Sequence, residues 1–276
     1  MTKSHARRRA LIVAWSVLAT IATVCSVVAP QGKPAIATPA VFRPFQHAIQ
    51  LYNDGAIDYI SNYDPPLMIT GQQFCRQAYD PTKLKLISRG YIAAGRTTVY
   101  NSPPCGGSVD GEIVLVASKG THVQPTIRQP FAHQDPNDGT LRSYVCVGAT
   151  FYLRAWWTCS THITPNSEFF ATAQADEMRS VAAYLNDRPV IVGGDFNRQQ
   201  GQSGPAAWYN GFHESDEGAA NYGKDTFDND HGLYKKIDYI FSGKLRTDAA
   251  YGVARVGCGN QTGSDHCFIH GTHRFL

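Results

Sequence analysis

Charged residues are scarce in this chain, and several patterns common in other protein classes are missing. Lys, Arg, Asp and Glu make up 17% of the 276 residues, against 43% hydrophobic residues, which excludes an intrinsically disordered chain. The sequence has no long linker, internal repeat or low-complexity tract, so one domain is the economical interpretation. No Cys-x-x-Cys pair or Cys/His cluster has the spacing of a structural zinc site.

The first part of the chain has no acidic residue. Lys3 and the arginines at 7–9 precede an uncharged, largely apolar run over residues 10–32, and small residues with the spacing of a cleavage site follow. This order predicts a signal peptide over residues 1–37 and a secreted or extracellular domain over 38–276. Because the apolar run is also about long enough to cross a bilayer, an uncleaved membrane anchor is the alternative.

The positive charge of the whole chain comes from this leader. The chain has 25 Lys and Arg against 22 Asp and Glu, and five of the basic residues lie within 1–37. The remaining domain therefore has 20 basic and 22 acidic residues, a net charge near −2. The overall charge gives no evidence for a nucleic-acid-binding surface.

Cysteine usage is typical of an oxidising compartment. One of the seven cysteines lies in the leader, and the other six are an even number, as expected of disulfides in an exported domain. Six cysteines allow fifteen pairings, and the sequence alone does not choose among them. We favour pairs of sequence neighbours, because one pair flanks a predicted hairpin and another a Gly-rich loop: Cys75–Cys105, Cys146–Cys159 and Cys258–Cys267.

Hydrophobic periodicity predicts many strands and few helices. Apolar residues at helical spacing predict helices over residues 45–60 and 167–185. Apolar and β-branched runs predict a hairpin of 144–149 and 150–158, and further strands at 67–70, 111–118, 190–192, 237–241 and 267–269. Residues 199–226 are rich in Gly, Asn and Asp and predict a long loop-rich segment. This mixture favours an α+β sandwich with sheets inside and helices outside.

The strongest chemical signal lies in residues 190–198, where an apolar strand runs through two glycines to Asp195 and Asn197. In an extended segment, residues two apart point to the same side, so both side chains would face one site. A carboxylate can hold a divalent cation or orient a water, and an amide can donate to a phosphate oxygen. A simple turn is the alternative, since Gly, Asp and Asn are common turn residues.

Three further polar positions adjoin apolar strands. Asp238 interrupts an apolar strand, and a buried carboxylate needs a partner or an open cleft; an outward-facing edge position is the alternative. Asp265 and His266 end a loop, and an imidazole beside a carboxylate suits acid–base chemistry near neutral pH, although such a dipeptide is often accidental. His162 closes the second hairpin strand, where a histidine is usually structural.

Taken together and in this order, these segments resemble the endonuclease/exonuclease/phosphatase superfamily, which includes DNase I-like nucleases. Thr-His at 161–162, Asp-Phe-Asn at 195–197, Ile-Asp-Tyr-Ile at 237–240 and Ser-Asp-His at 264–266 carry the resemblance. It implies a DNase I-like fold, a four-layered α/β/β/α sandwich with the site at one end of the two sheets. It also implies in-line attack of water on a phosphate ester, assisted by Mg²⁺ or another divalent cation.

The resemblance implies a catalytic role for five residues. His266 would act as the base or contact the transition state, oriented by Asp238. Asp195 would orient the attacking water, and Asn197 would bind the phosphate. His162 would contact a phosphate oxygen or assist the leaving group.

The N-terminal motifs depart from the family pattern. The family has a Glu after an early strand as its main metal ligand, and Gln73 stands at that place, so Gln73 and Asp265 are the predicted metal ligands. An amide oxygen binds a hard cation without contributing charge, which lowers the affinity. Ala40 stands where the family has Asn, and Glu112 is a substitute carboxylate unless it is an ordinary solvated strand residue.

Three functions agree with the sequence. The first is a metal-dependent phosphoesterase acting on a nucleic acid, a lipid head group or a small phosphate ester. The second is a non-catalytic family member that binds a phosphorylated ligand or a protein partner. The third is an unrelated disulfide-rich extracellular domain, in which the motif residues would lie far apart. Membrane contact is expected only through an uncleaved N-terminal segment.

Overall fold

The computed structural model describes residues 41–42, 45–48, 68–74, 76–97, 113–151, 153–215, 225–228, 234–256 and 265–276. The chain divides into two units, Met1–Thr38 and Pro39–Leu276, and every described residue lies in the second. Several predictions therefore fall outside the described residues: the leader, Ala40, Glu112 and the Cys75–Cys105 pair. No helix within the described ranges is long and apolar enough to cross a membrane.

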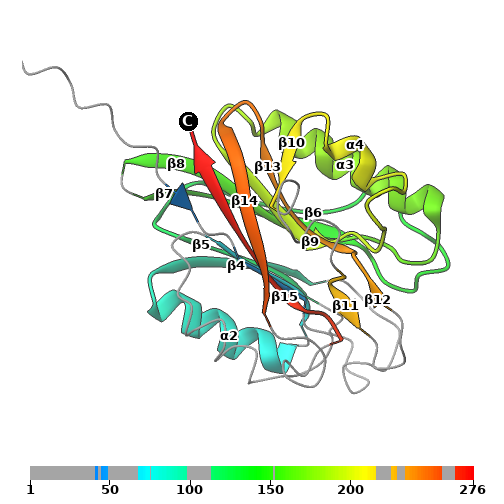
Figure 1. Cartoon of the computed structure of the whole chain (residues 1–276). Coiled ribbons are helices and arrows are strands. Elements are labelled where there is room, and N and C mark those ends of the chain that lie inside the picture. Colours follow the sequence, from blue (N-terminus) through cyan, green and yellow to red (C-terminus); the bar gives the residue numbers. More distant parts are fainter. Residues whose placement is uncertain are drawn as a thin grey trace, which may run out of the picture. The chain divides into compact units, whose positions relative to one another are not determined.

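Two large β-sheets form the middle of the second unit (Figure 1). The seven-stranded sheet has the order β1 (Val41–Phe42), β15 (Phe268–Phe275), β2 (Phe45–Ala48), β3 (Met68–Phe74), β5 (Ile113–Lys119) and β4 (Tyr91–Thr97), with β14 (Thr247–Val256) also paired to β15. The six-stranded sheet has the order β10 (Phe212–Glu214), β13 (Asp238–Gly243), β9 (Val190–Asp195), β8 (Arg154–His162), β7 (Ser143–Phe151) and β6 (Thr121–Pro130). A short separate pair joins β11 (Phe227–Asp228) to β12 (Tyr234–Lys235).

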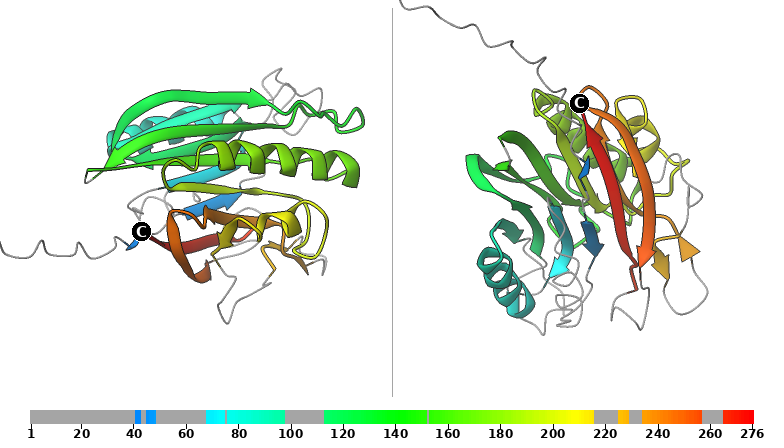
Figure 2. Two further views of the ribbon diagram at one scale, coloured as in Figure 1. Left: turned by 90° about the horizontal axis from the view of Figure 1, so that it is seen from above. Right: turned by 60° about the vertical axis from the view of Figure 1, so that its left-hand side comes forward.

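The two sheets pack face to face, and helices cover their outer faces (Figures 1 and 2). Val114 and Val116 of β5 pack against Val145 and Val147 of β7 in the space between the sheets. Helix α2 (Arg76–Ser88) packs on β4 and β5, while α3 (Glu168–Tyr184) packs on β9 and α4 (Pro205–Trp208). The layers are therefore α/β/β/α, and the predicted α+β sandwich is confirmed.

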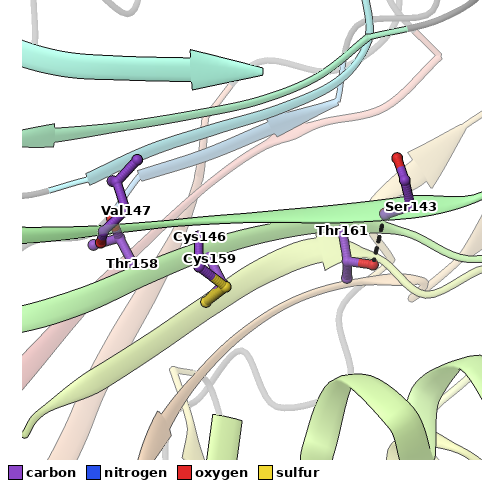
Figure 3. The surroundings of a disulfide bond; sticks show 6 residues. All are labelled: Ser143, Cys146, Val147, Thr158, Cys159 and Thr161. Carbon is purple, nitrogen blue, oxygen red and sulfur yellow. Dashed lines mark hydrogen bonds between the residues drawn. A yellow bond between two sulfur atoms is a disulfide. The ribbon is translucent and has the colours of Figure 1, made fainter. Parts of the chain in front are cut away.

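A disulfide lies on the outer face of the six-stranded sheet (Figure 3). Cys146 of β7 and Cys159 of β8 are register partners with their Cα atoms 4.0 Å apart, and their side chains are buried in one cluster with Ala171 and Met178 of α3. The predicted Cys146–Cys159 pair is confirmed. Cys267 is also disulfide-bonded, and the predicted Cys258–Cys267 pair stays a prediction because Cys258 lies outside the described residues.

Most predicted elements are present, usually longer than predicted. The helix at 167–185 is α3, and the predicted hairpin is β7–β8, although 150–151 belong to β7 and Leu153 lies in the turn. The loop-rich segment also contains α4 and β10, and the sequence did not indicate α2, β4, β6 or β14.

The helix predicted over residues 45–60 is wrong at its start. Phe45–Ala48 is strand β2, which pairs with β3 in parallel and with β15 in antiparallel orientation. Strands on both sides satisfy its backbone N–H and C=O groups, and this tertiary pairing outweighs the helical spacing of its apolar residues. Residues 49–60 lie outside the described ranges.

A buried histidine links the two sheets. His273 of β15 has its Nδ1 2.6 Å from the hydroxyl of Ser242 on β13, and its Nε2 2.6 Å from the hydroxyl of Ser215, which follows β10. Burial lowers the pKa of His273 to about 3, and repulsion from His213 adds to the decrease. The ring is therefore neutral at pH 7, with one donor and one acceptor nitrogen for the two hydroxyls.

This bridge should make the fold sensitive to acid. The unfolded chain binds a proton at His273 near pH 6.5 and the folded chain only near pH 3. The free energy of unfolding should therefore fall, as pH decreases between these values, by about 1.4 kcal/mol per pH unit for this one group. His273→Gln should lower stability at pH 7.5 and remove this part of the pH dependence. Urea unfolding at pH 7.5, 6 and 5 tests this, with the exposed His122→Gln as control; an unchanged pH dependence in His273→Gln would contradict it.

Candidate active site

Three predicted site residues lie side by side at one end of the six-stranded sheet. His162 ends β8, Asp195 ends β9, and Asp238 begins β13. The register pairs His162 with Asp195, and Asp195 with Asp238. Asp195 and Asp238 lie an even number of residues from Ile191 and Ile240, which pack between the sheets, so these carboxylates point to that same side.

The fourth residue comes from the segment that leads into β15 of the other sheet. His266 lies two residues before β15 and forms an isolated β-bridge with Phe227. Its Nδ1 is 2.8 Å from Oδ2 of Asp238, and its Nε2 is 3.8 Å from Oδ2 of Asp195 and 4.0 Å from Oδ1 of Asp265. The site therefore closes across the gap between the sheets, and His266, Asp195 and Asp238 are all buried there.

The buried charges determine one another's protonation. Burial alone would lower the pKa of His266, but the attraction and hydrogen bond of Asp238, with further attraction from Asp195 and Asp265, raise it to about 9. Burial raises the pKa of Asp195, and repulsion from Asp238 adds to the increase, whereas His266 and His162 oppose it. At neutral pH the His266 ring is a cation with an Nε2–H that can donate to an anionic oxygen.

The chain turns sharply after Asp195. A Cβ at Gly194 would lie 2.5 Å from the carbonyl oxygen of Thr161, so only glycine fits the neighbouring strand there. Asn197 has φ 50°, a left-handed conformation that Asn tolerates better than most residues. Its N–H donates to Oδ1 of Asp195 at 2.7 Å, and its Nδ2 donates to the carbonyl of Ile163 at 2.8 Å. The Asn197 amide thus joins the ends of β8 and β9, and none of the described residues accepts its second N–H, which can donate to a ligand.

A pocket of about 370 Å³ adjoins these side chains. The lining includes His162, Asp195, Asn197 and His266. Asp238 lies behind this lining and is hydrogen-bonded to His266. The rest of the lining is mainly basic and polar, and it consists of Arg142, Arg198, Lys235, Gln199, Gln202, Pro165, Phe227 and Ile237. The side chain of Gln73, in β3, is not among those that the structure describes.

Arg142 is a site residue that the sequence did not indicate. It directly precedes Ser143, the register partner of His162, and it is buried. Its Nη1 lies 2.8 and 2.7 Å from the two ring nitrogens of His162, while Nε and Nη2 donate to the carboxylate of Asp138 at 2.6 and 2.9 Å. Because a guanidinium only donates, the His162 nitrogen that it contacts must accept. A single arginine in a loop belongs to no sequence motif, so the sequence could not predict its role. The register of β7 and β8 brings it beside His162.

The short β11–β12 pair holds the Asp238 and His266 segments together. The hydroxyl of Thr226 accepts a hydrogen bond from the N–H of Asp238 at 2.9 Å and from the preceding N–H at 3.1 Å. The carbonyl of Thr226 accepts the N–H of Cys267 at 2.7 Å. The ring of Phe227 packs edge-on against His266, with 5.2 Å between centroids. Thr226 is the last residue of the segment that the sequence predicted only as a loop, and no predicted element covered Phe227.

The described donor atoms fit a hard divalent cation. Asp195, Asp238 and His266 offer ligand atoms within 4.8 Å of one another. Carboxylate oxygens are the ligands that Mg²⁺ prefers, and a cation would offset the repulsion between Asp195 and Asp238. Among the described residues, the carboxylates of Asp195 and Asp238 are thus the candidate oxygen ligands for the cation. Asp265, which the resemblance suggested as a ligand, lies outside this group.

Comparison with known families agrees with the geometry. The model of the Endonuclease/Exonuclease/phosphatase family matches residues 78–266, more than half of the chain. This chain belongs to that family. Members of the family hydrolyse phosphate esters, and the resemblance inferred from the four motifs is confirmed. A comparison with curated protein sequences gave no match.

Solved structures of the family share the fold. A family member from Bacteroides vulgatus has a TM-score of 0.67 and 14% identity, over 86% of this chain and 100% of that one. The catalytic domain of human Nocturnin with a bound sulfate anion has a TM-score of 0.65 and 14% identity, over 87% and 97%. A humanised TDP2 of D. rerio has a TM-score of 0.62 and 16% identity, over 84% and 98%. These TM-scores show a common DNase I-like fold.

Removal of the Asp238 carboxylate should lower the pKa of His266. That pKa is raised from 6.5 to about 9, so the contact stabilises the fold fully below pH 6.5 and is lost as pH rises through 9. Asp238→Asn should therefore destabilise the protein at pH 6 by at most about 3 kcal/mol, because Asp195 and Asp265 also raise this pKa, and by much less at pH 10. NMR titration of His266 and urea unfolding, both with EDTA, test this. The exposed Asp187→Asn is the control, and a His266 pKa that stays near 9 in Asp238→Asn would contradict the assignment.

Proposed function

We propose that this protein is a secreted, metal-dependent phosphoesterase that hydrolyses a phosphate ester by in-line attack of water. The observation that carries the proposal is the convergence of His162, Asp195 and His266 on one pocket, with Asp238 bonded to His266 at 2.8 Å. Family membership supports the reaction class, and the sulfate bound by the Nocturnin domain shows that a related fold accepts a tetrahedral anion.

The proposed role of each site residue follows from its charge and its hydrogen-bonding capacity. The reacting phosphate lies among three donors, Arg142, the protonated His266 and the second N–H of Asn197, which stabilise the charge that develops on its oxygens. The Asp195 carboxylate accepts a hydrogen bond from the attacking water, and its raised pKa brings it closer to the range of an effective base. His162, held by Arg142, faces the leaving-group oxygen.

A divalent cation would fit beside the carboxylates of Asp195 and Asp238. When bound, it supplies Lewis-acid polarisation of a phosphoryl oxygen. The carboxylates and the dyad of Asp238 and His266 hold their arrangement through protein hydrogen bonds. The cation therefore adds charge to a site whose proton donors and acceptors are already in place.

Activity and its metal dependence test the proposal directly. The exported protein should release p-nitrophenol from bis-p-nitrophenyl phosphate with Mg²⁺ or Ca²⁺, and EDTA should abolish the release. His266→Ala should reduce kcat by about 10²- to 10³-fold, the usual cost of removing one preorganised donor to the transition state, while the surface variant Asp187→Asn should retain the wild-type rate. Plasmid DNA and phospholipids, assayed in parallel, separate nuclease from lipid-directed activity. A rate that neither EDTA nor His266→Ala changes would contradict the proposal.

Gln73 favours a second candidate, a non-catalytic member that binds a phosphorylated ligand. Gln73 ends the QQ pair of β3, where the family pattern has a charged metal ligand. Gln73→Glu discriminates between the two functions. A wild-type protein that is already active and changes little favours the hydrolase, whereas activity that appears only in Gln73→Glu favours the binding protein.

Secretion is supported by the cysteines and by the N-terminal pattern. The Cys146–Cys159 disulfide and the disulfide of Cys267 are typical of an oxidising compartment. N-terminal sequencing of the exported protein should find a start near residue 38. An intact residue 1 in the membrane fraction would favour the anchor, and intact protein in the cytosol would contradict export.

A further inference from the structure

The reacting phosphate does not account for the whole pocket. A volume of about 370 Å³ lies in the range of sites that hold small organic molecules. Arg198, Gln199, Gln202 and Lys235 line it as well, and no step of the proposed hydrolysis uses them. Two of these four side chains are cationic, so this part of the pocket is suited to a further anionic group.

Arg198 is held in place at the pocket wall. It is half-buried, and its Nη1 donates to the carbonyls of Pro165 at 3.1 Å and of Asn197 at 2.9 Å. Its own carbonyl accepts the hydroxyl of Tyr239 at 2.9 Å. The Nε is buried and has no hydrogen-bond partner among the described residues. Since a guanidinium has five N–H donors, the bonds made by Nη1 leave donors for a ligand.

None of the described residues forms an ion pair with Arg198. Burial lowers the pKa of Arg198, and attraction by Glu168 opposes this decrease. Within the described residues Glu168 makes no contact with it below 4.0 Å, and Oε1 of Glu168 accepts the hydroxyl of Ser203 at 2.5 Å instead. Lys235 of β12 is exposed at the same pocket. A guanidinium held by hydrogen bonds and an exposed ammonium therefore line the same pocket.

We propose that Arg198 and Lys235 form a second anion-binding position, which holds another phosphate of the substrate beside the one that is hydrolysed. The inference rests on the proposed function, because it assigns a substrate class to the same pocket. That substrate is a phosphate ester that carries a second phosphate group, either the next phosphate of a nucleic-acid strand or the second phosphate of a diphosphate. A prepositioned guanidinium binds such a group by charge-assisted hydrogen bonds at little cost in side-chain entropy.

Matched substrates test this position. The p-nitrophenyl ester of thymidine 5′-phosphate is compared with the same ester bearing an additional 3′-phosphate. Wild-type kcat/KM should be about tenfold higher for the second ester, the gain expected of one charge-assisted hydrogen bond. Arg198→Gln should bring this ratio close to one through KM, and Arg198→Lys should keep part of it. Arg188→Gln is the control, because Arg188 is also half-buried but lies outside this pocket.

A binding measurement separates this inference from the proposed function. Calorimetry should find pyrophosphate bound more tightly than inorganic phosphate in the wild type, with the difference lost in Arg198→Gln. If the 3′-phosphate raises kcat/KM but pyrophosphate is not preferred, the position binds the next phosphate of a nucleic-acid strand. If pyrophosphate is preferred but the 3′-phosphate has no effect, the position binds the second phosphate of a diphosphate. If neither ester is hydrolysed but the pyrophosphate preference depends on Arg198, hydrolysis is wrong and the second position stands.

The opposite result would overturn the inference alone. If both esters are hydrolysed and neither the ester ratio nor the pyrophosphate preference depends on Arg198, the second position does not exist while the hydrolase remains. Circular dichroism and thermal melting establish that Arg198→Gln is folded. Should it fail to fold, Lys235→Gln and Arg198→Lys carry the same comparison, and wild-type ratios in both would likewise contradict the proposal.

Discussion

The register of β8, β9 and β13 decides where the chemistry of this protein lies. It sets His162, Asp195 and Asp238 in one row and turns their side chains toward the opposite sheet. A shift of one residue in any of these strands would send its polar side chain to the other face. Gly194, which packs on the backbone of Thr161, keeps two of the strands close at this end.

The two buried histidines show how the neighbours of a ring decide its protonation. His266 and His273 are both buried and belong to the same C-terminal segment. Carboxylates surround His266 and raise its pKa to about 9, whereas hydroxyls bind His273 and burial lowers its pKa to about 3. One ring is therefore a cation at the site, and the other is a neutral bridge between the sheets. Only His266 therefore has the positive charge that favours contact with a phosphate.

Local charge, and not net charge, governs what the pocket can bind. The domain after the leader has a net charge near −2, yet the pocket is lined by Arg142, Arg198 and Lys235. Arg142 is tied to Asp138 and His162, while Arg198 is tied only to backbone carbonyls in the described contacts. The first arginine thus supports His162, and the second keeps donors for another group of the substrate.

The sequence by itself determined the elements whose signal is local. Glycines followed by Asp195 and Asn197, the Asp238 strand and the Asp265–His266 pair were readable because neighbouring residues define them, and α3 followed from its periodicity. Only the tertiary structure decided that Phe45–Ala48 is a strand, because its partners β3 and β15 lie far away in the chain. It alone also placed Arg142 beside His162 and Thr226 against Asp238, since hydrogen bonds between distant segments leave no periodic trace in a sequence.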